Sequence, residues 1–133
     1  MGEVAMAEYI AGLKMSAFVL DYDYNAPTEE HLKNTHKQMF EIIRKNNPDL
    51  PILILTRPKA GNCQTFEIER IKIIKQTYLD AIANGDRNVR FLDMSNTFNL
   101  FGGDSCTVDN CHPNDLGFMC MAQAVYEQLR EML

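Results

Sequence analysis

The stretch Pro51-Ile52-Leu53-Ile54-Leu55-Thr56 lies near the centre of the chain and is the clearest predictor of its fold. The apolar run is too short for a helix and is typical of a strand that is buried on both faces. It ends in a loop, residues 57–64, that carries Pro58 and Gly61. Since strands of this kind occur in parallel sheets covered by helices, the segment predicts an α/β protein.

Two similar runs lie on either side of this strand. The first is Ser-Ala-Phe-Val-Leu-Asp at residues 16–21, which leads into the polar turn at residues 22–27. The second is Asn-Val-Arg-Phe-Leu-Asp at residues 88–93. Their apolar centres and the turn formers that end them predict two further buried strands.

Helical periodicity fills the intervals between the strands. We predict helices at residues 3–14, at 28–46 with Thr28 as N-cap, at about 65–84, and from near Pro113, which suits a first helical position, to the end. We expect buried stripes at Leu32, Met39, Phe40 and Ile43, at Ile71, Ile74, Tyr78 and Ile82, and at Phe118, Met121, Ala122, Val125 and Leu129. His31 and His36 are five residues apart, so we expect two solvated histidines rather than one metal-binding face.

The resulting order of elements is αβαβαβα. Right-handed crossovers then give a three-layer α/β/α sandwich, with a parallel sheet of about three strands. In such sheets, ligands bind beyond the carboxyl ends of the strands. The predicted site therefore lies among the loops that begin at Asp21, Arg57 and Asp93.

Length and composition limit the possible functions. The 133 residues fit a single domain, 1–133, and the net charge of -5 argues against a nucleic-acid partner. No apolar run is long enough to predict a membrane span, and the first residues do not form a secretory signal. The compartment stays unknown, with the cytoplasm as the default.

The cysteines do not predict a metal site. Cys63, Cys106, Cys111 and Cys120 contain no C-x-x-C pair, so we expect neither a metal nor another cofactor. Cys106 and Cys111 are close enough in sequence for a small disulfide loop, and two free thiols are the alternative.

Residues 104–118 hold the densest cluster of chemically active side chains. Asp109 precedes His112 by three residues, so a turn would bring the carboxylate within reach of a ring nitrogen. That pair is the orienting half of a nucleophile triad. The alternative is a helix-capping loop in which the acid pairs with a surface histidine.

Asp109-Asn110-Cys111-His112-Pro113 resembles the D-x-x-H-P block of the SGNH hydrolases, also called the GDSL lipase and acylhydrolase family. In that block, Asp and His complete a serine triad. Residues 21–27 resemble the block whose Asn donates to the oxyanion hole, and Asn25 is the matching residue. The resemblance covers residues 2–133 and implies a flavodoxin-like sandwich, no cofactor and an ester substrate, either a small molecule or a carbohydrate.

The family's nucleophile block, G-D-S-x, and its second oxyanion block have no counterpart at the expected place. The chain thus looks like the C-terminal part of an SGNH domain. Gly103-Asp104-Ser105 spells G-D-S, but it lies in the loop just before Asp109, so we expect Ser105 not to be the nucleophile. Cys111 is adjacent to His112 and points away from it in an extended chain, so it is also a poor candidate.

Two functions follow from these observations. The first is a serine ester hydrolase with His112, Asp109 and Asn25 as catalytic residues, present as a fragment that is inactive alone. The second is a non-catalytic fragment that self-associates or serves as a binding or scaffold domain. In both cases, strand 16–21 would be an exposed apolar edge, which predicts a homodimer or a higher homo-oligomer.

Overall fold

The computed structural model describes residues 2–60 and 68–133 of the chain. The chain forms α1 (Val4–Ala11), β1 (Phe18–Leu20), α2 (Glu29–Asn46), β2 (Ile52–Leu55), α3 (Ile68–Ala83), β3 (Val89–Leu92), two short 3-10 helices η1 (Phe98–Leu100) and η2 (Gly103–Cys106), and α4 (Asp115–Met132). The predicted order of helices and strands is confirmed. The predicted first turn of the third helix, residues 65–67, lies outside the described residues, as does Cys63.

The three strands form one parallel sheet in the order β1-β2-β3. Phe18 is in register with Ile52, and Ile52 is in register with Val89. All four residues of β2 are buried, as the central apolar run predicts. Because side chains alternate along a strand, Ile52 and Ile54 point to one face of the sheet, and Leu53 and Leu55 point to the other.

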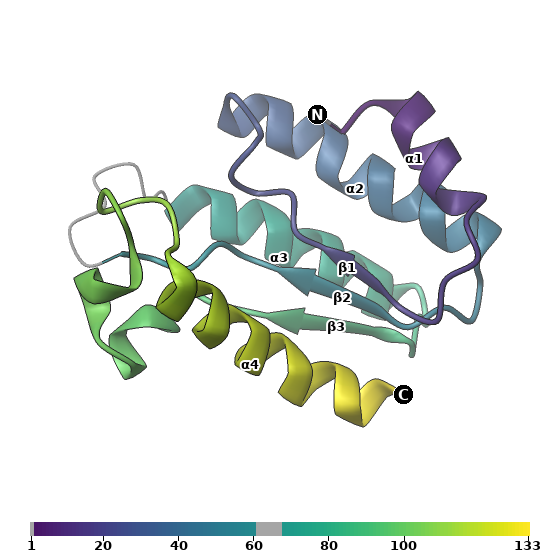
Figure 1. Cartoon of the computed structure of the whole chain (residues 1–133). Coiled ribbons are helices and arrows are strands. Elements are labelled where there is room, and N and C mark those ends of the chain that lie inside the picture. The colour runs from purple at the N-terminus through teal and green to yellow at the C-terminus, as the bar shows by residue number, and fades with distance from the viewer. Residues whose placement is uncertain (1, 61–67) are drawn as a thin grey trace.

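Helices cover both faces of the sheet, so the predicted three-layer sandwich is confirmed. Figure 1 shows α1, α2 and α3 on one side and α4 alone on the other. The first side holds the larger core, which includes Leu20, Ile54 and Ile74. The second side is smaller and joins Leu53, Leu55 and Met94 to one face of α4.

The predicted solvation of His36 is wrong. Its side chain is fully buried, and Nδ1 lies 2.8 Å from Thr77 Oγ1 on α3. The ring stacks on Tyr22, with centroids 6.2 Å apart, while Nε2 makes no hydrogen bond in the described part of the chain. Burial lowers the pKa of His36 from 6.5 to about 4, so the buried ring is neutral at pH 7.

The apolar stripes of the last two helices are partly wrong. In α3 the buried residues are Arg70, Ile74, Thr77 and Ala81, and Ile82 is exposed. In α4, Phe118 and Ala122 are exposed, whereas Met121, Val125 and Leu129 pack on the sheet as expected. The prediction for α3 placed Ile74 and Tyr78 in the core correctly, and it missed Arg70 and Thr77 because these buried residues are polar and find partners elsewhere in the chain.

The last helix begins later than its proline suggests. Asn114 is the N-cap, and its Oδ1 accepts from the amide of Gly117 at 3.0 Å. Pro113 instead lies in an antiparallel bridge with Thr107. The expected position of Pro113 as the first helical residue is therefore wrong, because an Asn side chain supplies the cap that helices prefer.

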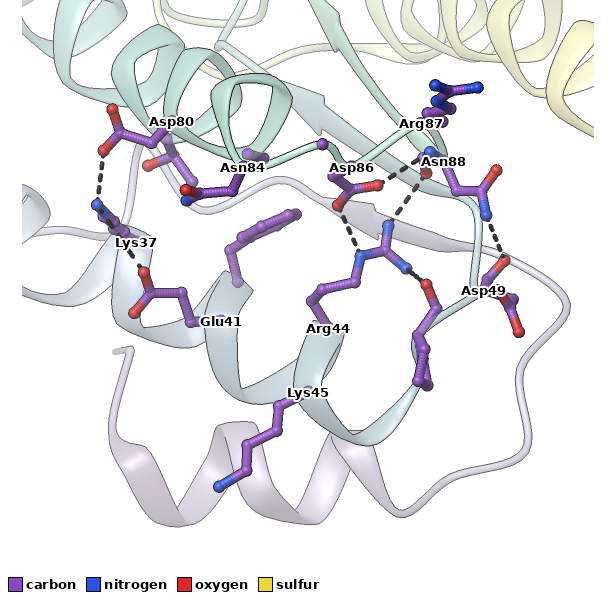
Figure 2. Close-up of a pocket in the computed structure, with 15 residues that line it drawn as sticks. Lys37, Glu41, Arg44, Lys45, Asp49, Asp80, Asn84, Asp86, Arg87 and Asn88 are labelled. Carbon is purple, nitrogen blue, oxygen red and sulfur yellow. Dashed lines mark hydrogen bonds and ion pairs between the residues drawn. The ribbon is translucent and has the colours of Figure 1, made fainter.

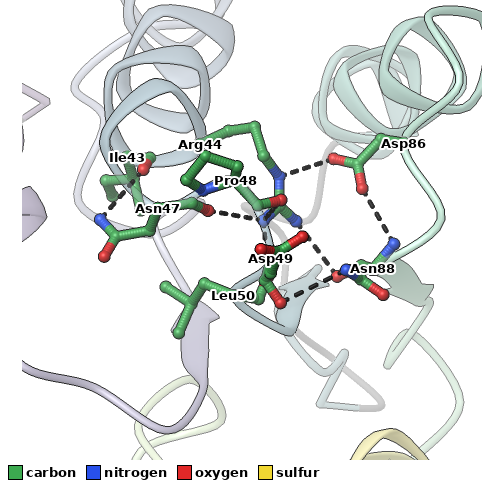
Figure 3. Close-up of polar contacts among 8 residues, drawn as sticks. All are labelled: Ile43, Arg44, Asn47, Pro48, Asp49, Leu50, Asp86 and Asn88. Carbon is green, nitrogen blue, oxygen red and sulfur yellow. Dashed lines mark hydrogen bonds and ion pairs between the residues drawn. The ribbon is translucent and has the colours of Figure 1, made fainter.

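Arg44 connects the turns at the amino-terminal edge of the sheet, as Figure 3 shows. Its Nε donates to Asp86 at 2.7 Å, and Nη1 donates to the carbonyl of Leu50 at 2.6 Å. Nη1 also reaches the carbonyls of Asn47 and Pro48, and Nη2 donates to the carbonyl of Asn88 at 3.1 Å. One guanidinium thus fixes the segments that lead into β2 and β3.

Candidate active site

Asp109 and His112 are in direct contact in the loop that follows β3. Asp109 Oδ2 lies 2.6 Å from His112 Nδ1. The other carboxylate oxygen, Oδ1, accepts from the amides of His112 at 2.7 Å and Cys111 at 3.0 Å. These bonds, that of the His112 amide first, lower the pKa of Asp109, which is therefore an anion at neutral pH. The predicted contact is present.

This arrangement leaves one ring nitrogen available. When Nδ1–H donates to the Asp109 carboxylate, the lone pair of the neutral imidazole is on Nε2. The His112 side chain is 68% exposed and the Asp109 side chain 49%. A contact so exposed contributes little to stability.

The turn that carries the pair is closed by its own hydrogen bonds. The amide of Val108 donates to the carbonyl of His112 at 3.0 Å, and the amide of Asn110 donates to Thr107 Oγ1 at 3.1 Å. Asn110 has a φ of 65°, a left-handed conformation that asparagine tolerates better than most residues. Asn114 Nδ2 donates to the carbonyls of Ser105 and Thr107, which attaches the turn to η2.

The loop after β1 reaches the same place. The ring of Tyr24 lies 6.1 Å from that of His112, tilted by 45°. The guanidinium of Arg57, the second residue after β2, lies 4.7 Å from the centre of the Tyr24 ring. The loops after all three strands therefore meet at the carboxyl edge of the sheet, at the left of Figure 1.

A buried ion pair fixes the loop after β1. Asp23 Oδ2 accepts from the amide of Arg57 at 3.2 Å, and Oδ1 lies 3.7 Å from Arg70 Nη1. Arg70 also donates to the carbonyls of Asp23 and Ala26, at 2.9 and 3.0 Å. The Asp23 side chain is 1% exposed, so the pair is shielded from water and firmly positioned.

Asn25 lies on this anchored loop, directly after Tyr24. Its side chain is exposed and makes no hydrogen bond to another described residue. The contact between Tyr24 and His112 places the loop of Asn25 beside the histidine. The role of Asn25 as an oxyanion donor stays a prediction.

Ser105 is exposed in η2, and its carbonyl accepts from Asn114 Nδ2 at 2.8 Å. In the described part of the chain, no hydrogen bond joins the Ser105 hydroxyl to His112. Cys111 lies within the turn itself, where its amide bonds to Asp109. The structure thus brings neither of these two side chains into a hydrogen bond with the ring of His112.

Sequence reasoning missed Tyr24, Arg57 and the pair formed by Asp23 and Arg70. Their position was the available signal, since Asp23, Tyr24 and Arg57 follow directly after strands whose carboxyl ends share one edge. Arg70 lies inside α3, and nothing in its helical pattern distinguishes it from an exposed arginine.

A hollow of about 630 Å³ lies at the opposite end of the sheet, between α2 and α3. Figure 2 shows charged side chains that pair across it, with Lys37 Nζ on α2 lying 2.6 Å from Asp80 Oδ2 on α3, and Arg44 of α2 bonded to Asp86 in the turn after α3. The pair of Lys37 and Asp80 links the two helices, and the described residues that line the hollow include no histidine or cysteine.

Residues 2–60 and 68–133 contain no group of three or more metal-ligating side chains. None of the helices in this part of the chain combines the length and the hydropathy needed to span a bilayer.

The family described as "GDSL-like Lipase/Acylhydrolase family" matches residues 2–130 of the chain. A search of curated proteins found no match to this chain. Among solved structures, the fold is similar to a protein described as a GDSL-like lipase from Bacteroides ovatus ATCC 8483, with a TM-score of 0.76 and 23% identity. It is also similar to the salicylyl-acyltransferase SsfX3 from a tetracycline biosynthetic pathway, with a TM-score of 0.77 and 15% identity.

A third similar structure is a peptidoglycan O-acetylesterase, with a TM-score of 0.66 and 16% identity. Each alignment covers 98% of this chain. It covers only 40% of the Bacteroides ovatus protein, 42% of the acyltransferase and 41% of the O-acetylesterase. The chain therefore spans about two fifths of the length of these structures. At such identities, the likeness shows a shared fold.

Proposed function

The chain belongs to the GDSL-like lipase/acylhydrolase family, and we propose that it supplies the general base and part of the oxyanion hole of a serine ester hydrolase. His112 removes the proton of the nucleophile and later returns it to the leaving alcohol. Asp109 orients the ring and stabilises the imidazolium, and Asn25 donates to the developing oxyanion. Residues 1–133 act as one domain in this proposal.

The contact of 2.6 Å between Asp109 Oδ2 and His112 Nδ1 is the main support for this proposal. It leaves Nε2 as the basic nitrogen, directed away from the carboxylate. The pair lies at the carboxyl edge of a parallel sheet, where ligands of such folds bind. A helix cap alone would not need the imidazole, since Asn114 already caps α4.

We further propose that the nucleophilic serine is not among these 133 residues, so the chain alone does not turn over esters. Ser105 lies in the loop of the base itself and makes no hydrogen bond to His112. Removing a triad serine lowers turnover on the order of a million-fold in a well-studied protease, so at most a background rate is expected.

The substrate in this proposal is a carboxylic ester with a small acyl group, on a carbohydrate or another small alcohol. A similar structure is described as a peptidoglycan O-acetylesterase, which supports carbohydrate esters as one class. The exposed imidazole is compatible with a large alcohol part, because the histidine is not enclosed by the described chain.

The first experiment uses the 133-residue chain with p-nitrophenyl acetate and a fluorophosphonate probe, located by mass spectrometry. We expect no labelled serine and the same background rate in wild type and in Ser105→Ala. A probe adduct on Ser105, lost together with activity in Ser105→Ala, would show that the chain holds its own nucleophile.

The second experiment expresses the chain together with the coding sequence directly upstream of Met1. If that sequence encodes a G-D-S block in frame, the longer protein should hydrolyse the ester. His112→Ala should then lower kcat on the order of a million-fold, Asp109→Asn on the order of 10⁴-fold, and Asn25→Ala on the order of 10² to 10³-fold. His31→Ala on α2 is the matched control, and full activity in His112→Ala would refute the assignment.

Self-association is the second candidate function. β1 pairs only with β2 in the described chain, so its other edge lacks a strand. Phe118, Met119 and Tyr126 on α4 are 58%, 71% and 57% exposed. An open apolar edge is a template for pairing with a second copy. Light scattering at micromolar concentration should detect dimers or larger species that Phe118→Glu weakens, and a monodisperse monomer would contradict this.

A further inference from the structure

Cys106 and Cys120 lie together in a small core cluster with Ala60 and Phe98. Their exposed fractions are 0% and 3%, and both are free thiols in this structure. Cys106 ends η2, a few residues before the turn of Asp109 and His112, and Cys120 lies in the second turn of α4. The cluster thus joins the loop of the candidate base to the helix that follows it.

The backbone brings the two residues together. The amide of Asn114 donates to the carbonyl of Cys106 at 3.0 Å. Gly117 packs so closely on this carbonyl that any side chain there would clash with it. Cys120 follows Gly117 by three residues and therefore lies on the same face of α4. The η2 segment is held against this face, which brings Cys106 and Cys120 into one cluster.

The environment keeps the Cys106 thiol protonated. Burial, followed by the hydrogen bond with the Cys120 thiol, raises the pKa of Cys106. A protonated, buried thiol reacts slowly, so the pair is stable against casual oxidation and reacts when η2 opens briefly from α4.

We propose that Cys106 and Cys120 form an intramolecular disulfide when the protein meets a small disulfide oxidant, and that this bond fixes the loop of Asp109 and His112 to α4. One cysteine, as its thiolate, attacks a sulfur of oxidised glutathione, which forms a mixed disulfide and releases one glutathione. The second thiolate attacks the protein sulfur of that mixed disulfide and releases the other glutathione. The protein loses two hydrogens and the oxidant becomes two thiols.

Cys111 is the competing partner for Cys106, because it is closer in sequence. It lies in the turn rather than in the cluster, and its amide is bonded to Asp109. A bond from Cys106 to Cys111 would require Cys106 to leave the core contacts with Phe98 and Cys120. The fold therefore favours Cys120, and it does so whether or not the chain takes part in ester hydrolysis.

Peptide mapping tests the assignment on the full 133-residue chain. The protein is equilibrated with oxidised glutathione, the remaining thiols are alkylated, and the chain is digested without reduction. A linked peptide of Cys106 and Cys120 is expected in wild type and in Cys111→Ser, and not in Cys106→Ser or Cys120→Ser. A link to Cys111 or Cys63, a glutathione adduct without a link, or unreacted Cys106 and Cys120 would each overturn the proposal.

Thermal unfolding gives a second readout. Oxidation should raise the Tm of wild type and Cys111→Ser by several degrees and leave Cys106→Ala and Cys120→Ala unchanged, because the cross-link restricts the unfolded chain. Alanine serves here because a buried serine hydroxyl could unfold the variant. A Tm that does not rise in the linked wild-type protein would refute the role of the bond in fixing the loop.

Discussion

His36 on α2 and Arg70 on α3 are polar side chains that lie in the core. His36 and Arg70 are both buried, and each finds a partner from another element. Burial without a partner is costly for a charge and less so for a neutral ring, so the two residues respond differently to change. The contribution of His36 to stability should depend on pH, and the contribution of Arg70 should be lost when its charge is removed.

We expect acid to destabilise the fold through His36. Its pKa is about 4 when folded, against an ordinary value of 6.5. Between these values the unfolded chain binds a proton that the folded chain does not, so stability falls as the pH drops below about 6.5. The loss approaches about 3 kcal/mol near pH 4, from about 1.4 kcal/mol for each pKa unit.

Urea unfolding of wild type and His36→Gln between neutral pH and pH 4 measures this effect. The carboxylates titrate in both proteins, so the difference between the two curves isolates His36. The difference should shrink with acidification, because only wild type loses the contribution of a neutral histidine. Parallel curves would show that His36 is protonated without penalty.

Removing Arg70 should destabilise the protein strongly. Arg70→Met leaves the Asp23 carboxylate buried without its cation, which costs about 3 to 5 kcal/mol in comparable pairs. Arg87→Met, at an exposed position, should change the free energy of unfolding by less than about 0.5 kcal/mol. Asp23→Asn added to Arg70→Met should recover part of the loss, and equal effects of Arg70→Met and Arg87→Met would contradict the assignment.

At the scale of elements, local signals were sufficient wherever a helix or strand is defined by its own residues. Thr28 caps α2 as predicted, by accepting from the amide of His31 at 3.0 Å. The run at β2 was recognised from its four buried apolar residues. The stripe of α3 was recognised only in part, because its buried residues Arg70 and Thr77 are polar and have partners distant in sequence.

The candidate site divides in the same way. The contact of Asp109 with His112 spans three residues, so a turn rule could predict it. Tyr24 and Arg57 reach this place through tertiary packing, which no local pattern contains. The start of α4 was misplaced because both Pro113 and Asn114 carry start signals, and the side-chain cap of Asn114 prevailed.

Asn114 should matter more than an ordinary cap. Asn114→Ala removes the bond to the Gly117 amide, worth about 1 kcal/mol, and also the two donations to Ser105 and Thr107. Asn114→Asp keeps the acceptor and loses the donor. We expect Tm to fall most in Asn114→Ala. It should fall less in Asn114→Asp, and also less in Thr28→Ala, which removes an ordinary helix cap. A Tm of Asn114→Asp equal to that of wild type would show that the donor contributes nothing, and equal Tm values for the two Asn114 variants would show that the cap contributes nothing.

At the scale of the whole molecule, a parallel sheet divides the protein into two ends. The carboxyl edge gathers the loops of Tyr24, Arg57 and His112, and the amino-terminal edge is fixed by Arg44. The candidate residues Asp109 and His112 therefore lie at one end of β2, and the contacts of Arg44 lie at the other.

Hydrogen exchange should reveal this organisation. The amides of β2 are paired on both sides and should exchange most slowly, while β1 and the turn of His112 should exchange faster. Hydrogen exchange followed by mass spectrometry, at two protein concentrations, measures the protection of β2, of β1 and of the turn of His112. Protection of β1 that equals that of β2 at all concentrations would mean that the edge strand is already covered.

The turn from Thr107 to Asn114 has one further consequence. Its bridge, its left-handed Asn110 and the bonds of Asp109 all lie within the segment, so the geometry of the Asp109 and His112 pair is specified almost entirely by adjacent residues. We therefore expect this segment, residues 107–114, to keep this geometry when it is transferred to another protein. Grafted between a strand and a capped helix of an unrelated framework, it would carry an oriented imidazole with it, as a self-contained part for the design of new hydrolytic proteins.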